Sequence, residues 1–258
     1  MSCFPLQSLN LSKNSLMTAN NNRAGVRTAS MLNELFTGMQ ASGILDHLME
    51  NYPGKVIFSS SMGAEDQVIT HLLSGSGSNP PIFTLDTGRL FPETYDLIAK
   101  TSERYGFRLR IIFPEASRVE EMVNASGINL FYEGIEQRKL CCQIRKTDPL
   151  KRALRGKRIW VTGLRQSQSP TRGHVSLAQW DQNNRIIKVN PLLEWSEEDV
   201  WAFIREHRVP YNVLHDKDFP SLGCQPCTRA VLPGEDLRAG RWWWEKPETK
   251  ECGLHRQG

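Results

Sequence analysis

Short apolar runs alternate with amphipathic stretches through the first two thirds of the chain. Runs rich in Val, Ile and Phe predict strands at residues 56–58, 82–85, 109–113 and 159–162. The stretches 65–73 and 92–105 have the apolar spacing of helices. Because strands separated by helical stretches of this length need crossover connections, the pattern predicts an α/β fold built on a parallel sheet.

A later helix is marked at both of its ends. Ser196 and Asp199 form a capping box, and Trp195 and Val200 form the hydrophobic staple that accompanies it. Pro210 ends this helix, because proline cannot continue the hydrogen-bond ladder. Beyond this point the chain shows no further periodicity, so an irregular C-terminal segment is expected.

The two ends of the chain differ from this body. The first 33 residues are rich in Ser, Asn and Leu and contain no acidic residue. We expect residues 1–35 to be a disordered tail. A start placed too early, with Met17 or Met31 as the initiator, and a targeting segment are the alternatives. Residues 36–258 are expected to form a single domain with a mobile C-terminal tail at about 243–258.

Composition narrows the classes of partner. A total of 32 Lys and Arg against 28 Asp and Glu gives a net charge of +4, which suits a local pocket for an anionic small molecule better than a surface that coats nucleic acid. No apolar run approaches the ~20 residues that span a bilayer, so we expect a soluble protein without a membrane partner. The sparse cysteines and their CxxC pair favour a reducing compartment, the cytoplasm.

Four of the six cysteines fall into two pairs, Cys141-Cys142 and Cys224-Gln-Pro-Cys227. Consecutive side chains diverge by about 100° on a helix or point to opposite faces of a strand, so Cys141 and Cys142 converge poorly on one tetrahedral zinc ion. A [4Fe-4S] cluster has four separate iron corners and suits this spacing better. A zinc site and unrelated buried thiols are the alternatives.

A fifth cysteine, Cys252, lies near the C-terminus with Lys250, His255 and Arg256 close by in the sequence. Neighbouring cations lower the pKa of a thiol and so favour the reactive thiolate. We therefore expect Cys252 to act as a nucleophile, with a tail thiol of no function as the alternative. Cys3 belongs to the N-terminal tail and is assigned no role.

Three loops follow predicted strands and meet at the carboxyl edge of the sheet, where ligands bind in such folds: 59–64, 86–88 and 163–172. Hydroxyl and backbone N–H groups of the first loop can bind phosphate or ribose oxygens, although a serine-rich turn also caps helices. Arginines bind phosphate or sulfate oxygens in pairs. The arginines that could complete an anion pocket are Arg165, Arg172, Arg238 and Arg241.

Together these segments resemble the assimilatory adenylyl-sulfate and phosphoadenylyl-sulfate reductases over roughly residues 40–258. Five motifs carry the resemblance: SSMGAED at 60–66, LDTGRLFPETY at 85–95, GLR at 163–165, WSEEDVW at 195–201 and KECGLH at 250–255. The resemblance implies an adenine-nucleotide α-hydrolase-like fold related to the ATP pyrophosphatases. Members with the CC…CxxC cysteines are similar to the branch that carries a [4Fe-4S] cluster and prefers adenosine 5′-phosphosulfate, and this chain has all four.

The resemblance also implies a reaction, a step of assimilatory sulfate reduction and cysteine biosynthesis. Cys252 would attack the sulfur of the activated sulfate, release AMP and become an S-sulfocysteine, from which a separate thioredoxin or glutaredoxin would release sulfite. Basic groups would surround the phosphosulfate, and the loops would hold the nucleotide. The residues expected at the substrate are Ser60, Ser61, Gly63, Asp66, Leu85, Asp86, Thr87, Gly88, Lys146, Arg165, Arg172, Arg238, Arg241 and His255.

Three rival functions differ in testable features. A reductase of the 3′-phosphorylated substrate would need further cations near the ribose. An ATP-pyrophosphatase-type tRNA-thiolating enzyme would use an SGGxDS-like loop, which residues 60–66 lack. A zinc-binding nucleic-acid module would need a basic stripe with interleaved aromatic residues, which the net charge of +4 does not suggest. Whether the chain forms a homo-oligomer is left open by its sequence.

Overall fold

One sheet forms the centre of the computed structural model, which describes residues 7–75, 81–168, 175–246 and 250, with side chains from residue 22 onward. Its strand order is β3-β2-β1-β4-β6-β5. The strands are β1 Val56–Ser60, β2 Ile82–Leu85, β3 Arg110–Ile112, β4 Ile159–Val161, β5 Ala178–Asp181 and β6 Ile186–Val189. Neighbouring strands run parallel except at the edge, where β5 pairs antiparallel with β6.

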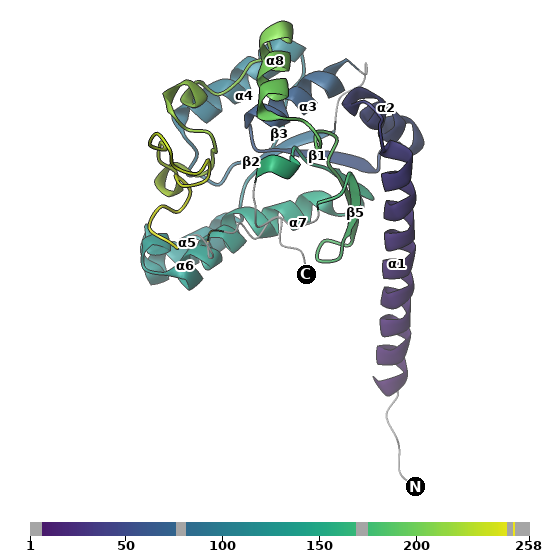
Figure 1. Cartoon of the computed structure of the whole chain (residues 1–258). Coiled ribbons are helices and arrows are strands. Elements are labelled where there is room, and N and C mark those ends of the chain that lie inside the picture. The colour runs from purple at the N-terminus through teal and green to yellow at the C-terminus, as the bar shows by residue number, and fades with distance from the viewer. Residues whose placement is uncertain (1–6, 76–80, 169–174, 247–249, 251–258) are drawn as a thin grey trace.

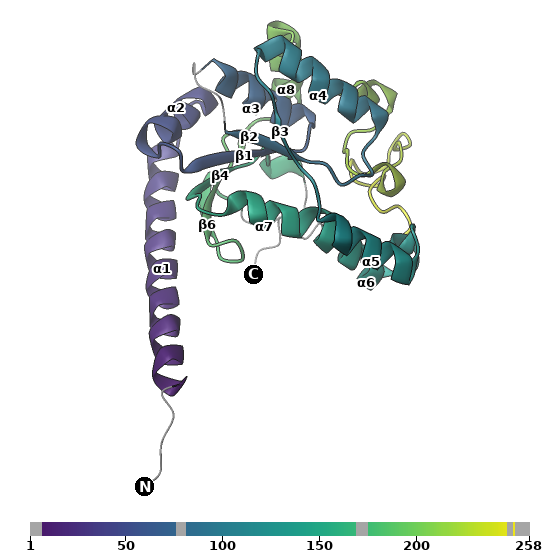
Figure 2. The same cartoon turned by 180° about the vertical axis from the view of Figure 1, so that it is seen from behind.

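Helices cover both faces of this sheet (Figures 1 and 2). The longer ones are α1 Gln7–Phe36, α2 Ala41–Asn51, α3 Ala64–Ser74, α4 Pro92–Tyr105, α5 Ala116–Ser126, α6 Ile135–Cys142, α7 Asp148–Leu154 and α8 Glu197–His207. The short turns are η1 Leu130–Tyr132, η2 Gln143–Thr147, η3 Gln166–Gln168, η4 Val213–Lys217 and η5 Gln225–Cys227. Helices α2, α3, α4 and α8 lie on one face and α7 on the other, which makes three layers.

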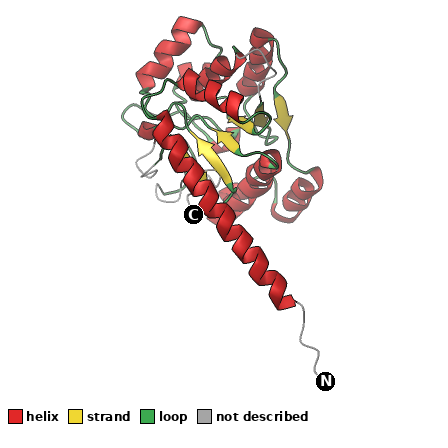
Figure 3. Ribbon diagram, turned by 90° about the vertical axis from the view of Figure 1, so that its right-hand side faces the viewer, coloured by secondary structure: helices red, strands yellow, loops and turns green. Residues whose placement is uncertain are grey.

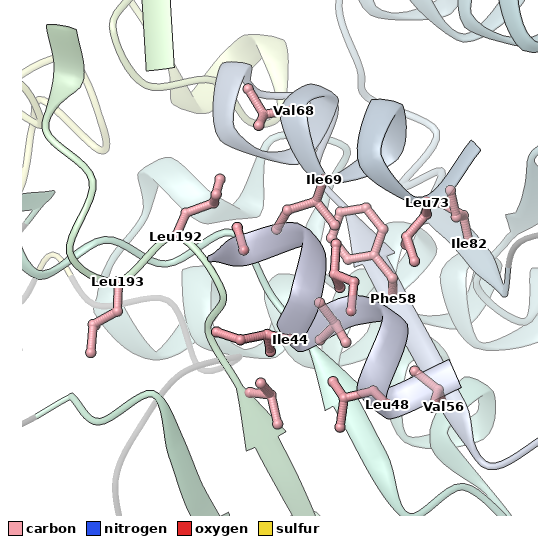
Figure 4. Close-up of a cluster of buried hydrophobic side chains, with 14 of the residues drawn as sticks. Ile44, Leu48, Val56, Phe58, Val68, Ile69, Leu73, Ile82, Leu192 and Leu193 are labelled. Atoms are coloured by element: carbon pink, nitrogen blue, oxygen red, sulfur yellow. The ribbon is translucent and has the colours of Figure 1, made fainter. Parts of the chain in front are cut away.

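Side chains that alternate between the two faces of the sheet form a hydrophobic core on each face. Val56 and Phe58 of β1 pack against α2 and α3, where Ile44 and Ile69 are completely buried (Figure 4). Ile57, between them, belongs to a second cluster on the α7 face. Because successive side chains of a strand point to opposite faces, a strand that is apolar throughout needs cover on both sides. The apolar strand sequences therefore indicate a three-layer architecture.

The elements expected from the sequence are present. The four predicted strands correspond to β1 to β4, and the three predicted helices correspond to α3, α4 and α8. The capping box is formed as expected: the Ser196 N–H donates to Asp199 Oδ2 at 2.8 Å, and the Asp199 N–H donates to Ser196 Oγ at 3.0 Å. The hairpin of β5 and β6, whose strands are only four residues long, was not predicted.

Helix α1 differs from the disordered tail predicted for residues 1–35. Its second half packs on β5, with Ala29, Leu32 and Phe36 buried and with Asn33 Oδ1 accepting a hydrogen bond from the backbone of Ala178. The first half extends away from the rest of the chain (Figure 3). The three buried residues recur at helical spacing, so the apolar period is present but short, and polar residues on either side conceal it.

The C-terminal tail expected from residue 243 is also packed where the structure describes it. The Glu245 N–H donates to the Trp242 carbonyl at 2.8 Å, and Trp244 contacts the Tyr132 ring edge-on. None of the helices in the described ranges is long and apolar enough to cross a membrane.

The strand order reverses between β1 and β4. From β1 the chain continues to β2, toward one edge of the sheet, and from β4 it continues to β5 and β6, toward the other edge. Crevices at such switch points, beyond the carboxyl ends of the strands, are where open α/β sheets bind ligands. The loops that follow β1 and β4 are two of the three that the sequence assigns to the substrate.

Candidate active site

A cavity of about 690 Å³ lies at this switch point. Its volume is in the range of pockets that hold small molecules the size of a nucleotide. Ten of the residues predicted at the substrate line it: Ser60, Ser61, Gly63, Asp66, Leu85, Thr87, Lys146, Arg165, Arg238 and Arg241. Of the other predicted residues, Arg172, His255 and the expected nucleophile Cys252 lie outside the described residues.

The serine loop is held in place by Asp66 of α3. The Ser61 N–H and hydroxyl both donate to Asp66 Oδ2, at 2.5 and 2.6 Å. Gly163, in the loop after β4, approaches so closely that a Cβ there would lie 2.2 Å from Asp66 Oδ1. Helix α3 begins after Gly63, which has no side chain to cap it, so the helix N-terminus at the cavity can accept an anion.

Asp66 should make the stability of the protein depend on pH. Burial raises the pKa of its carboxyl to about 6, against the hydrogen bonds from Ser61 that lower it. Because an unfolded chain has a lower value, the stabilisation from the protonated carboxyl is present below pH ~4 and is lost as the pH rises through 6. We expect Asp66→Asn to gain about 3 kcal/mol relative to the parent between pH 4 and pH 7.

Urea unfolding at several pH values measures this difference. Asp46→Asn, at an exposed carboxyl of α2, is the control and should run parallel to the parent. A constant difference between Asp66→Asn and the parent across this range would contradict the prediction.

The loop after β2 is held in shape by the Asp86 side chain, and of residues 86–88 only Thr87 lines the cavity. Asp86 Oδ1 accepts hydrogen bonds from the Gly88 N–H at 2.7 Å and from the Tyr95 hydroxyl at 2.9 Å. Neither Asp86 nor Gly88 lines the cavity. Gly88 has a φ of +71°, which glycine adopts without strain. Of the four residues predicted at the substrate in this segment, Leu85 and Thr87 line the cavity, whereas Asp86 and Gly88 shape the loop behind it.

All four paired cysteines line a second, smaller cavity of about 20 Å³. Cys141 and Cys142 end α6, where the helix widens into the π-helical turn η2. Cys224 immediately precedes the short turn η5, and Cys227 is the last residue of that turn. All four are free thiols. Two backbone contacts anchor the turn that carries Cys224 and Cys227: the Gln225 N–H donates to the Arg89 carbonyl at 2.8 Å, and the Trp242 N–H donates to the Cys227 carbonyl at 3.1 Å.

The cysteine cavity brings together four thiols from two distant segments of the chain. No three Cys, His, Asp or Glu side chains within the described part of the chain converge as ligands of one metal ion would. The Trp242 Nε1, from a residue that lines this cavity, is buried without a hydrogen-bond partner among the described residues. Four thiols and an indole N–H without a partner are groups that could hold an iron–sulfur cluster, whose sulfides accept hydrogen bonds.

Basic residues surround the cysteines and would offset the charge of four thiolates. Arg89, Arg138, Arg145 and Lys146 line the same cavity. Burial acts to raise the pKa of the Cys224 thiol, but the charge of Lys146 and a hydrogen bond with Thr87 outweigh it, so this pKa lies below its usual value.

Lys146 connects the two cavities, since its side chain lines both. The Thr87 hydroxyl, which lies 3.3 Å from Cys224 Sγ, provides a second connection. An anion in the large cavity and the cysteines in the small one would therefore act on the same cation. This shared lysine is the central feature of the site.

The arginines of the large cavity differ in the hydrogen bonds and ion pairs that they already form within the protein. Arg165 forms an ion pair with Glu65 at 2.8 Å and also donates to the Ser167 hydroxyl. Arg241 donates to the Leu222 carbonyl at 2.5 Å, and its buried Nε has no hydrogen-bond partner in the described structure. Arg238 is half-buried and lines the wall. Arg241 therefore keeps one donor that no described residue uses, whereas Arg165 is held by Glu65 and Ser167.

His215 of η4 and Trp201 of α8 also line the cavity, although neither was predicted at the substrate. Burial lowers the pKa of the His215 imidazole, and its Nε2 is buried without a hydrogen-bond partner among the described residues. The two rings meet edge-on at 5.4 Å. A lone histidine in an irregular segment and a tryptophan on a helix face have no spacing signal that would distinguish them from core residues.

Comparison with known proteins gives the site its context. The model of the phosphoadenosine phosphosulfate reductase domain matches residues 55–230. A protein of Allochromatium vinosum named adenosine 5′-phosphosulfate reductase is 52% identical over 202 residues, which cover 78% of this chain and 79% of that protein. A protein of the same name from Agrobacterium fabrum is 43% identical over 242 residues, 94% of this chain and 92% of that one.

Solved structures agree with the fold. The phosphoadenylyl-sulfate (PAPS) reductase from Candida auris, in a phosphate complex, matches with a TM-score of 0.66 and 28% identity, covering 79% of this chain and 96% of that chain. FMN adenylyltransferase from Candida glabrata matches with a TM-score of 0.52 and 17% identity over 91% and 82% of the two chains, a likeness in fold alone. The predicted parallel-sheet α/β class, shared with adenine-nucleotide enzymes, is thereby confirmed.

Proposed function

Because this chain belongs to the phosphoadenosine phosphosulfate reductase family, as its motifs predicted, we propose that it reduces adenosine 5′-phosphosulfate to sulfite and AMP. The observation that carries the proposal is the pair of cavities that share Lys146. A nucleotide-sized cavity lined by basic residues adjoins four free cysteines, which is the combination expected from the resemblance to the adenosine 5′-phosphosulfate branch. Both named relatives, at 52% and 43% identity, act on this substrate according to their names.

The four cysteines would hold a [4Fe-4S] cluster, with one thiolate at each iron. When bound, the cluster would supply a fixed local charge beside the substrate, whereas the reducing electrons come from an external thiol. The chain's own residues support this placement. Arg145 donates to the Thr87 carbonyl at 2.7 Å, so the cysteine side of the site and the loop after β2 are held as one unit.

The chemistry begins with binding and charge neutralisation. Lys146, Arg238 and Arg241 would bind the phosphosulfate and withdraw charge from it, because a thiolate approaches a sulfur shielded by anionic oxygens only where cations offset the repulsion. The backbone of the serine loop and the N-terminus of α3 would hold the nucleotide phosphate. His255 and Arg172 are proposed to complete this ring of cations.

Cys252 would then take the sulfur. Its thiolate attacks, the bond from sulfur to the bridging oxygen breaks, and AMP leaves with the electron pair, which gives an S-sulfocysteine. A thiolate of thioredoxin or glutaredoxin attacks Cys252 Sγ, sulfite leaves, and the mixed disulfide is resolved by the second thiol of the partner. Sulfur passes from +6 to +4 as one dithiol becomes a disulfide. The reaction belongs to sulfate assimilation and, as we propose, to a reducing cytoplasm.

Two measurements test the proposal. Anaerobically purified protein should show visible absorbance and contain iron and acid-labile sulfide in amounts near four per chain. A colourless, zinc-loaded protein would refute the cluster. Incubation with adenosine 5′-phosphosulfate and a dithiol should release sulfite and AMP together, and a protein that releases neither would refute the reductase.

The 3′-phosphorylated substrate is the second candidate. It is favoured by the solved Candida auris relative, which is a phosphoadenylyl-sulfate reductase. Turnover of the two substrates at equal concentration decides between them. We expect faster turnover of the unphosphorylated one, because the four cysteines match its branch.

A further inference from the structure

We propose that the loop of residues 229–240 is the docking surface for the dithiol protein that releases sulfite from Cys252. This inference rests on the proposed function and adds to it where the reductant binds. The loop forms one wall of the large cavity, to which it contributes Val231, Leu237 and Arg238. Its outer side faces solvent.

The loop is held rigidly at its base. The Arg229 N–H donates to the Gly240 carbonyl at 3.0 Å, and Thr228 and Arg241 pair as an antiparallel bridge. Inside the loop, the Arg229 guanidinium binds both carboxylate oxygens of Glu235, at 2.8 and 2.7 Å. Planar two-point contacts of this kind add geometric specificity to the ion pair. The surface is therefore formed before any partner arrives.

Two leucines of this loop are unusually exposed. Leu232 is 64% exposed and Leu237 is 43% exposed. The charges of the loop cancel, because Arg229 and Arg238 are matched by Glu235 and Asp236. A partner would therefore meet the exposed side chain of Leu232, with Leu237 on the cavity side, on a loop without net charge. Small apolar contacts of this kind suit brief encounters, which are typical of electron-transfer partners.

Lys250 ties the expected nucleophile to the same loop. Its Nζ donates to the Ala239 carbonyl at 3.2 Å. Burial and the nearby charge of Arg229 lower the pKa of this amine, in agreement with a position against the loop. Cys252 follows two residues later, and two residues span at most about 7 Å. A protein that attacks Cys252 Sγ would therefore come within reach of residues 229–240.

The step itself explains why docking is needed. The partner's thiolate forms a bond with Cys252 Sγ while the bond to the sulfonate breaks, and sulfite leaves with the electron pair. Attack requires access to one particular sulfur, since attack on the sulfonate would return it to the partner. A surface that orients the partner's reactive thiol toward Sγ favours the productive reaction. A thioredoxin-type protein, with its dithiol at the surface, is the partner this geometry fits.

Leu232→Glu tests the proposal, since Leu232 lies outside the cavity wall. Ile128→Glu is the matched control, because Ile128 is 62% exposed but lies between α5 and η1. With thioredoxin or glutaredoxin, whichever reduces the parent faster, Leu232→Glu should raise the KM for the reductant about tenfold, as the loss of an apolar contact of about 1.4 kcal/mol would. Ile128→Glu should leave the KM for the same reductant at the value of the parent.

Two further readouts separate the causes. Reduction by a small dithiol, and single-turnover transfer of labelled sulfonate from adenosine 5′-phosphosulfate to the protein, should be unchanged in Leu232→Glu. A parent-like KM for the protein reductant would overturn the docking surface while leaving the reaction intact, and so would an equal loss with both reductants. Absence of sulfonate transfer to the parent would instead refute the proposed function. Leu232→Ser provides a milder variant, with the same direction expected.

Discussion

Replacement of Cys252 by serine is expected to lower sulfite formation by at least about 10³-fold, because a hydroxyl cannot form the S–S bond to the sulfonate or undergo thiol exchange. Nucleotide binding and iron content should be unchanged, because the substitution leaves the four cysteines that line the small cavity in place. The measurement is sulfite release under saturating reductant, with trapping of labelled sulfonate on the protein as a direct readout of the first step.

Cys3→Ser is the matched control, because Cys3 is the remaining cysteine outside the paired set. It should retain the turnover of the parent and its sulfonate labelling. Measurable turnover by Cys252→Ser would remove Cys252 from the mechanism and direct attention to the paired cysteines.

Replacement of Arg138 by methionine is expected to destabilise the protein by about 3–5 kcal/mol, because it leaves a buried carboxylate without its partner. Arg138 and Glu245 have side chains only 1% and 4% exposed and bind through two contacts of 2.8 Å. The guanidinium also lies 4.7 Å from the centre of the Trp242 ring. This pair joins α6, which ends in Cys141 and Cys142, to the segment that leads to the C-terminus.

Urea unfolding under anaerobic conditions measures the effect. Lys139→Met, one position along the same helix, is the control: its bridge to Glu136 is solvent-exposed, and its loss should change the free energy of unfolding by less than about 0.5 kcal/mol. The double variant Arg138→Met with Glu245→Met should recover much of the stability, because two apolar side chains leave no buried charge. Equal effects of the two single variants would contradict the role assigned to the buried pair.

Local sequence patterns were sufficient to predict the strands β1 to β4 and the helices α3, α4 and α8. Each has a continuous apolar run, a clear period or an explicit cap, as at Ser196. The β5–β6 hairpin and α1 lack such signals, because each is stabilised by the other: Gly25 of α1 lies so close to Trp180 of β5 that a Cβ there would be 2.4 Å from the ring. Contacts between segments more than a hundred residues apart have no local pattern to reveal them.

At the candidate site, too, some features follow from the sequence and others only from the tertiary structure. The sequence by itself determined its chemical groups: the two cysteine pairs, the serine loop and the cations, because spacing and residue type carry that information. Only the tertiary structure decided their roles. It turned Asp86 into a support for its own loop, committed Arg165 to Glu65, and added His215 to the wall. It also placed Lys146 between the two cavities, since burial and distance depend on how separate elements pack.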